Sequence, residues 1–246
     1  MKGRASVEAQ QNPEIIEDQE IQVKPLRRPM TRMRHVVSLI INIAAIVLTA
    51  CSIGSFFFAP AGVGIIQVTG WSLFMFFTND SAILAAICCA IVAYFNIQAL
   101  RGGKLEFKPW VLQLKAIGTA AVSLTFLTVL CFLGPSMGGW AAFYVGPNLY
   151  LHGICPLLSI VSYVFVERGY VSVKRALWAF APVILYGIVY CIEVMVIGYQ
   201  NGGWFDFYGF TRGGMWLISI IAMGVATLAI VLLERIPHSR KFVYFE

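Results

Sequence analysis

Six long apolar stretches decide what this chain can fold into. They lie at about 36–59, 72–99, 110–134, 148–167, 176–199 and 214–234. Each is long enough to cross a hydrocarbon core of about 30 Å, which takes roughly 20 helical residues. Their hydrophobicity is continuous rather than alternating, and backbone groups in lipid must satisfy each other, so helices are favoured over strands. The sequence predicts an all-α polytopic membrane protein, a six-transmembrane-helix bundle.

Composition agrees with this class. The chain has 59% hydrophobic and 12% charged residues, whereas a soluble domain carries about 25% charged residues. This excludes an ordinary soluble enzyme or binding module. We expect a multi-pass protein of the lipid bilayer, in the plasma membrane if the protein is bacterial.

Basic residues flanking the spans predict the orientation, because Lys and Arg next to spans stay on the cytoplasmic side. Fourteen fall on one side and only Arg212 on the other. The fourteen are Lys24, Arg27, Arg28, Arg32, Arg34, Arg101, Lys104, Lys108, Arg168, Lys174, Arg175, Arg235, Arg240 and Lys241. Both termini are therefore expected to be cytoplasmic. The net charge of +6 reflects this topology, and no nucleic-acid partner is expected.

The domain organisation is simple. Residues 1–34 are polar, with an acidic run followed by a basic one, and predict a disordered cytoplasmic tail. Residues 35–236 form the six-helix transmembrane domain, and 237–246 a cytoplasmic C-terminal tail. The connections on the outer side are rich in Gly and aromatic residues; they form either a lid at the outer interface or an ordinary aromatic belt.

Ionisable groups inside membrane spans are costly, and usually face the protein interior or a water-filled cavity. The interiors of the predicted spans hold four: Asp80, Lys115, His152 and Glu193. Lys115 lies near the cytoplasmic end of its span, where its side chain can reach the interface, and we interpret it as structural. The six cysteines have no zinc or redox spacing, and neither a metal nor a cofactor is expected.

Depth and helical phase bring some of these polar residues together. At 1.5 Å of rise per residue, Thr78, His152 and Glu193 lie about 8 to 10 Å inward from the outer ends of three different spans. A shared polar pocket in the outer half of the membrane explains this coincidence. Thr78 and Ser81 share one face of the second span, whereas Asp80 lies about 200° from Thr78. The fourth span carries a polar stripe: Asn148, His152, Cys155 and Ser159.

Thr78 and His152 suit nucleophilic catalysis. A threonine hydroxyl needs an adjacent base to attack a carbonyl, and a desolvated histidine tends to stay neutral, as a base must. A carboxylate could orient the imidazole, with Glu193 the first candidate and Asp80 the second. Candidates for stabilising an oxyanion are the side-chain amides of Asn79 and Asn148.

Two motifs around these residues resemble the androgen-induced-gene (FAR-17a-like) family of six-helix membrane proteins. FFTNDSAIL, residues 76–84, resembles the family's threonine segment, and NLYLHGICPLL, residues 148–158, its histidine helix. The aromatic loop WFDFYGF, residues 204–210, and the six-span layout extend the likeness over roughly residues 35–235, and the chain looks closest to the family's bacterial relatives.

The resemblance implies an intramembrane threonine hydrolase of lipid esters. Members of the family hydrolyse fatty acid esters of hydroxy fatty acids with one Thr and one His, which match Thr78 and His152. The proline after the histidine comes one residue earlier here than in animal members, so the lipid substrate stays open.

Two other functions also fit the sequence. One is a proton-coupled small-molecule transporter or channel in which Asp80, His152 and Glu193 relay protons. The other is a non-catalytic membrane partner protein, in which Thr78 bonds back to its own helix or across helices.

Overall fold

The part of the chain that the structure describes is a bundle of membrane-spanning helices. The computed structural model describes residues 30–59, 61–63, 66–136, 139–214 and 216–239. In this part, six helices are long and apolar enough to cross a membrane. They are Arg32–Ser55, Phe77–Leu100, Pro109–Ser136, Pro147–Val166, Val173–Ile197 and Trp216–His238. The protein is therefore an integral, multi-pass membrane protein with an all-α bundle, as predicted.

Two spans are continuous α-helices, and four contain tighter or wider turns. The continuous ones are α1 (Arg32–Ser55) and α2 (Phe77–Leu100). The third span joins α3 (Pro109–Thr128), a π-helical turn (Val129–Leu133) and α4 (Gly134–Ser136). The fourth joins α5 (Pro147–Leu149), a π turn (Tyr150–Ile154), α6 (Cys155–Val161) and a π turn (Ser162–Val166). The fifth joins α7 (Val173–Ala176), a 3-10 turn (Leu177–Ala179), α8 (Phe180–Cys191) and a π turn (Ile192–Ile197). The sixth joins α9 (Trp216–Arg235) and a 3-10 turn (Ile236–His238).

The connections contain short elements. Strands β1 (Ala61–Val63) and β2 (Ile66–Val68) pair antiparallel, with Gly62 opposite Gln67. The remaining ones are 3-10 turns: Gly70–Met75, Trp140–Tyr144, Tyr199–Asn201 and Arg212–Gly214.

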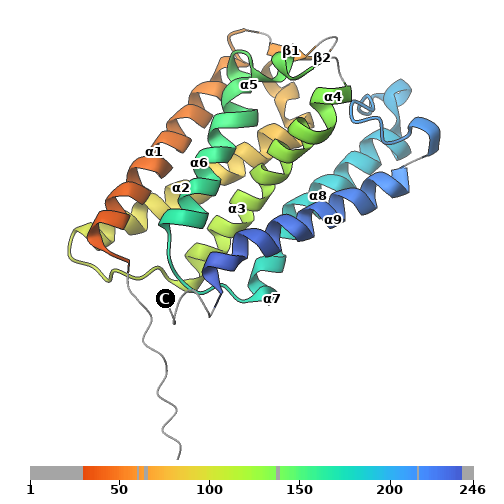
Figure 1. The fold of residues 1–246 in the computed structure, drawn as a ribbon. Helices are drawn as coiled ribbons and strands as arrows, with labels where there is room; N and C mark the ends of the chain where they lie inside the picture. The colour runs from red at the N-terminus through yellow and green to blue at the C-terminus, as the bar shows by residue number, and fades with distance from the viewer. Residues whose placement is uncertain (1–29, 60, 64–65, 137–138, 215, 240–246) are drawn as a thin grey trace, which may run out of the picture.

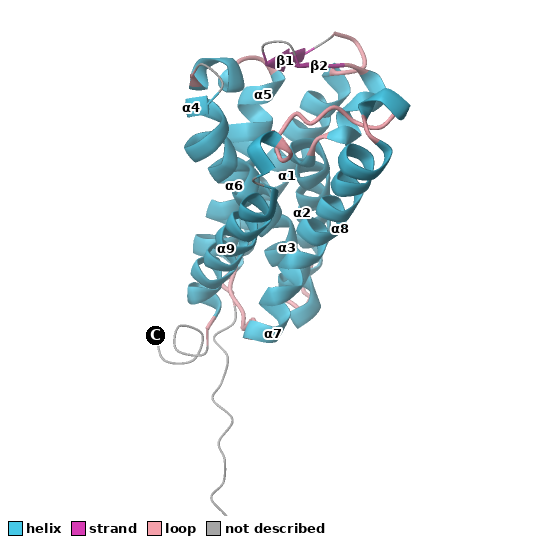
Figure 2. Cartoon of the chain, turned by 90° about the vertical axis from the view of Figure 1, so that its right-hand side faces the viewer, coloured by secondary structure: helices cyan, strands magenta, loops and turns pink. Residues whose placement is uncertain are grey.

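The third span is the centre of the bundle. In the apolar 18-residue stretch of the third span, 61% is buried inside the bundle, whereas the corresponding stretch of the fifth span is 6% buried. α3 packs against α2, α6 and α9, and Figure 1 shows it between α1, α2 and α6 on one side and α8 and α9 on the other. α1 begins and α9 ends at one end of the bundle, the basic end (Figure 1). The strands lie at the opposite end, the hairpin end (Figure 2).

The buried face of α1 is polar. Its buried residues follow a spacing of three and four: His35, Ser38, Asn42, Ala45, Thr49 and Ser52. Large aliphatic side chains point outward instead, such as Ile40, which is 62% exposed. Lipid solvates aliphatic side chains as well as a protein interior does, so helix association depends on small and polar residues.

The folded domain is slightly longer than predicted at both ends. Met30 is buried, its N–H bonds the Leu105 carbonyl at 3.1 Å, and the Thr31 hydroxyl caps α1. His238 is fully buried and stacks on Tyr163. These contacts bring 30–34 and 237–238 into the domain, whereas most of the two predicted tails lies outside the described residues.

Candidate functional site

Thr78 lies in the first turn of α2. The second span was expected to begin near residue 72, but Phe76 is extended (φ −112°, ψ 123°) and separates the turn Gly70–Met75 from α2. The estimate of depth from a straight helix therefore does not apply to Thr78. Its side chain is partly exposed, and among the described residues neither its hydroxyl nor its backbone N–H has a hydrogen-bond partner. Both groups are thus available at the start of a helix.

Its three neighbours have separate roles. The Asn79 amide donates to the Leu73 carbonyl at 2.8 Å and ties the preceding turn to α2. Ser81 donates to the Thr78 carbonyl at 3.0 Å and pairs with the Thr125 hydroxyl of α3 at 2.9 Å. Asp80 is half-buried in the first turn of α2, where a carboxylate interacts favourably with the helix dipole. Asn79, expected as an oxyanion donor, thus has one of its donors engaged.

His152 lies in the π turn Tyr150–Ile154. Pro156 cannot supply the N–H that an α-helix would direct at the His152 carbonyl. Immediately before it, the Cys155 N–H bonds the Tyr150 carbonyl five residues back, which widens the helix at His152. Such π turns often occur at functional sites. His152 is 8% exposed and, with Cys155 and Ser159, follows the buried stripe predicted for this span.

A backbone carbonyl orients the imidazole. His152 Nδ1 lies 3.1 Å from the Phe143 carbonyl oxygen, which can only accept, so Nδ1 carries the proton. In neutral imidazole, Nε2 is then the lone-pair nitrogen, as a general base requires. From the sequence, a carboxylate of Glu193 or Asp80 was expected to orient the imidazole. That expectation is not met, because among the described residues no hydrogen bond joins either side chain to His152.

Two further expected pocket residues make no side-chain hydrogen bond within the described part of the chain. Asn148 is half-buried in α5. Glu193 is half-buried in the π turn Ile192–Ile197, and its carbonyl accepts from the Gly198 N–H at 3.0 Å. No side-chain hydrogen bond in the described part of the chain thus links either residue to Thr78 or His152.

Thr78 and His152 are not hydrogen-bonded to each other in the described part of the chain. His152 contacts one apolar cluster directly, and Thr78 is connected to it only indirectly, through Ser81 and Thr125. Val129, Leu133 and Phe143 form it, with Tyr144 and Tyr208 packed against it. We call this set the outer cover. Its Phe143 ring contacts the His152 ring edge-on, with centroids 5.7 Å apart. On the other side Ser81, one turn after Thr78, bonds Thr125, which lies one turn before Val129.

The aromatic loop before α9 folds back over the start of α2. Tyr186 donates to the Met75 carbonyl at 2.7 Å, and Tyr190 donates to Asp206 at 2.7 Å. Asp206 also accepts from Thr211 and from the Phe210 N–H, which closes the loop. Burial raises the pKa of Tyr208 to about 12, so its hydroxyl stays protonated beside the charge of Asp80. The role of Asp206 was missed in the sequence, because its N–H partners lie four and five residues further on and form no standard Asx turn.

An apolar groove of about 290 Å³ lies between α1 and α2. Ile46, Thr49, Ala50, Ile53, Ile83, Ala86, Ile87 and Ala90 line it. Ile53 and Ile83 also pack against a cluster that contains Phe76 and Leu151, the residue before His152. The groove therefore runs along the bundle toward the site.

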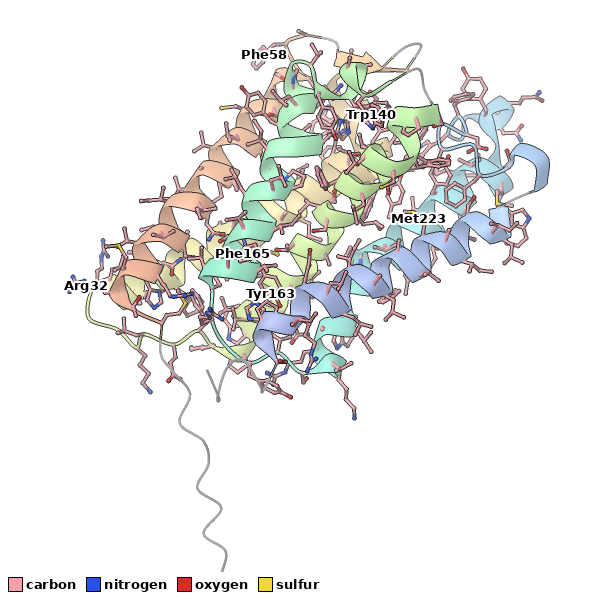
Figure 3. The ribbon with its side chains drawn as sticks, viewed as in Figure 1. Arg32, Phe58, Trp140, Tyr163, Phe165 and Met223 are labelled. Atoms are coloured by element: carbon pink, nitrogen blue, oxygen red, sulfur yellow. The ribbon has the colours of Figure 1, made fainter. Side chains whose placement is uncertain are left out.

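A second polar cluster, which the sequence did not indicate, lies toward the basic end. Lys115 does not reach the interface as expected: it is fully buried, with Nζ 2.7 Å from Asn42 Oδ1 and 3.0 Å from Cys89 Sγ. Glu167 and Glu234, at the ends of their spans, are buried too. Figure 3 shows Tyr163 toward this end and Trp140 toward the other. The polar stripe along α1 is the feature of the sequence that could have indicated this cluster.

Within the described residues, no group of three His, Cys, Asp or Glu side chains is placed to hold a metal ion. The chain matches no protein-family model, no curated protein and no solved structure. The resemblance therefore rests on its own motifs, and function has to be argued from the site.

Proposed function

We propose that the protein is an intramembrane hydrolase of lipid esters, with Thr78 as nucleophile and His152 as general base. The observation that carries the proposal is the bond between His152 Nδ1 and the Phe143 carbonyl, which leaves Nε2 free to accept a proton. The unpartnered hydroxyl of Thr78 supports it from α2.

In the proposed reaction, Thr78 Oγ attacks the ester carbonyl and its proton passes to His152 Nε2. The alcohol then leaves with that proton, and water hydrolyses the acyl-threonine to release the fatty acid. The N–H of Thr78, at the positive end of α2, is placed to bind the oxyanion of each tetrahedral intermediate. This N–H replaces the amide of Asn79 as the preferred donor.

The groove between α1 and α2 suits an acyl chain. It is lined almost entirely by apolar side chains of α1 and α2, and its lining residues Ile53 and Ile83 pack, like Phe76, against the cluster that contains Leu151. A fatty acid ester of a hydroxy fatty acid, the substrate class implied by the resemblance, could lie there with its ester toward Thr78.

Since Thr78 and His152 are not hydrogen-bonded, substrate binding has to bring them together. Catalytic hydrogen bonds are often long or poorly aligned without substrate. The outer cover, whose Phe143 ring contacts the His152 ring, is the part that would move.

The test is labelling of the purified full chain with a fluorophosphonate probe, together with fatty acid release from a fatty acid ester of a hydroxy fatty acid. Wild type should be labelled and active, Thr78→Ala should be neither, and Thr78→Ser should keep part of both. Thr227→Ala is the matched control, because the Thr227 hydroxyl only bonds its own helix at the Met223 carbonyl. Equal labelling of wild type and Thr78→Ala would contradict the proposal.

A further inference from the structure

A cluster of ionisable side chains lies far from Thr78 and is not used by the proposed hydrolase. Its members come from three segments: Lys115 from α3, Tyr163 and Glu167 from the end of the fourth span, and Glu234 from α9. None is more than 9% exposed. Burial of this many ionisable groups in a membrane protein marks a functional site by default.

One pair of charges in the cluster is balanced. Asn42 bridges Lys115 and Glu167: its Oδ1 lies 2.7 Å from the ammonium, and its Nδ2 lies 2.9 Å from Glu167 Oε1. The same carboxylate oxygen accepts from Ser38 at 3.1 Å and from Ser162 at 2.6 Å. Three donors, from Asn42, Ser38 and Ser162, thus converge on one oxygen of Glu167. Lys115 and Glu167 therefore form a neutral pair.

Glu234 is the second carboxyl group of this cluster and does not belong to the pair of Lys115 and Glu167. Ser123 donates to its Oε1, and its Oε2 is buried without a partner among the described residues. The nearby Arg235 directs its Nε to the Val171 carbonyl at 2.9 Å. A buried carboxylate without a counter-ion is costly, and binding a proton removes that cost.

Three oxygens in this cluster lack partners in the described part of the chain: Tyr163 Oη, Glu167 Oε2 and Glu234 Oε2. Both carboxylates interact electrostatically with Tyr163. A proton on one of these oxygens thus has acceptors close by. Glu234 is the least enclosed of the four residues and lies next to the basic end, from which a proton can enter.

We propose that Lys115, Tyr163, Glu167 and Glu234 form a proton-binding site, in which Glu234 takes up one proton from the basic end. The carboxylate and a proton combine to a neutral carboxyl, and no other bond is made or broken. The charges of Lys115 and Glu167 cancel, so Glu234 determines the net charge of the site before the proton binds. The site is independent of Thr78 and His152, and makes the protein responsive to pH on its basic side.

The charged and titratable groups around Glu234 set its affinity for the proton. On α3 these are Lys115 and, as a hydroxyl donor, Ser123. At the end of the fourth span they are Tyr163, Glu167 and Arg168. On the sixth span they are Arg235 and His238, whose two ring nitrogens face the Tyr163 and Gly169 carbonyls. His35 of α1 is connected to these groups by hydrogen bonds, first to Asn96 and from Asn96 to Ser38. Among these groups, the Lys115 ammonium acts on the charge of Glu234 and opposes its protonation.

The experiment is infrared difference spectroscopy of the purified full chain between neutral and mildly acidic pH, read at the high-frequency C=O stretch of a protonated carboxyl in apolar surroundings. Wild type should gain such a band as the pH falls. Glu234→Gln should lose it, whereas Glu106→Gln, at an exposed position, should keep it. A band that persists in Glu234→Gln would overturn the proposal.

Two further variants keep Glu234 and test how its neighbours set its proton affinity. Lys115→Met removes the opposing ammonium and should move the midpoint of the band to higher pH by at least about one unit, a tenfold gain in proton affinity. Ser123→Ala, a milder change, should move it in the same direction by less. Unchanged midpoints in both would overturn the assignment, as would a band that depends on Na⁺ at fixed pH and ionic strength, since the ligand would then be a cation.

Discussion

Replacing Asn42 with Leu, a side chain of similar size, should destabilise the bundle strongly. The Asn42 side chain holds one ammonium and one carboxylate in the interior of the bundle, at 2.7 Å from Lys115 Nζ and 2.9 Å from Glu167 Oε1. Leu makes neither bond. Both charged groups then stay buried with one partner fewer, and water cannot replace it without opening the bundle.

The size of the loss tells whether the two partners are charged. Hydrogen bonds between membrane helices contribute on average about 0.6 kcal/mol each, so two neutral bonds would give a loss of about 1 kcal/mol. Bonds to charged groups contribute about 1.5–3 kcal/mol each, and two of them give a loss of about 3–6 kcal/mol. The two expectations are far enough apart to be distinguished.

Reversible unfolding in mixed micelles measures the free energy of unfolding of wild type and Asn42→Leu. The control is Ile43→Leu, at the next position of α1, where the side chain is 45% exposed to lipid and the expected change is near zero. In the double variant with Lys115→Met, the loss should be smaller than the sum of the two single losses, because no unpaired ammonium remains. A loss of about 1 kcal/mol or less in Asn42→Leu would refute the charged bridge.

Three further predictions concern packing, pH and topology. Gly118→Ala should destabilise the bundle by about 1–3 kcal/mol, because the added Cβ would lie 3.0 Å from a backbone atom of α2, whereas Gly224→Ala meets nothing within 4 Å and should be neutral in the same unfolding assay. Burial raises the pKa of Asp206, but its hydrogen bonds outweigh burial and hold the pKa below 3.8; the loop it closes should therefore be stable above that pH and loosen below it in tryptophan fluorescence, and Asp206→Asn should remove this acid transition. With the basic end cytoplasmic, Lys104→Cys should react with an impermeant maleimide only in inside-out vesicles and Gln200→Cys only in right-side-out ones; the reverse pattern would invert the topology.

The number of spans and the positions of most span ends could be predicted because a bilayer leaves the chain few alternatives. A run of about 20 apolar residues has to be a helix there, whatever packs against it. The start of the second span was misplaced by five residues. Residues 72–76 are as apolar as the helix that follows, and hydropathy cannot detect the extended backbone at Phe76 that separates them.

The buried polar cluster was missed for a tertiary reason. Glu167 and Glu234 stand at the ends of apolar runs, where a carboxylate ordinarily meets water. Their burial depends on which helices pack beside them, and on donors such as Ser38 and Ser123 from other spans. The stripe on α1 predicts that this helix has a polar buried face, but not which charges lie opposite.

The candidate catalytic pair could be chosen from residue types, but its surroundings could not. A carboxylate is the partner that sequence reasoning looks for beside a histidine. The Phe143 carbonyl at that place leaves no trace in the sequence, because every residue has a carbonyl. Whether Thr78 and His152 act together stays a prediction for the labelling experiment.

The position of Lys115 in the third span has a consequence for how the protein is made. Its two hydrogen-bonding partners, Asn42 and Cys89, belong to the first two spans, and leave the ribosome before it. When the third span enters the membrane, Asn42 and Cys89 are therefore already there to bind the ammonium. Its counter-charge, Glu167, follows only with the fourth span. A nascent chain that stops after three spans keeps an uncompensated charge in its interior. The charge of Lys115 is therefore compensated only once the fourth span has been inserted and brings Glu167 to Asn42.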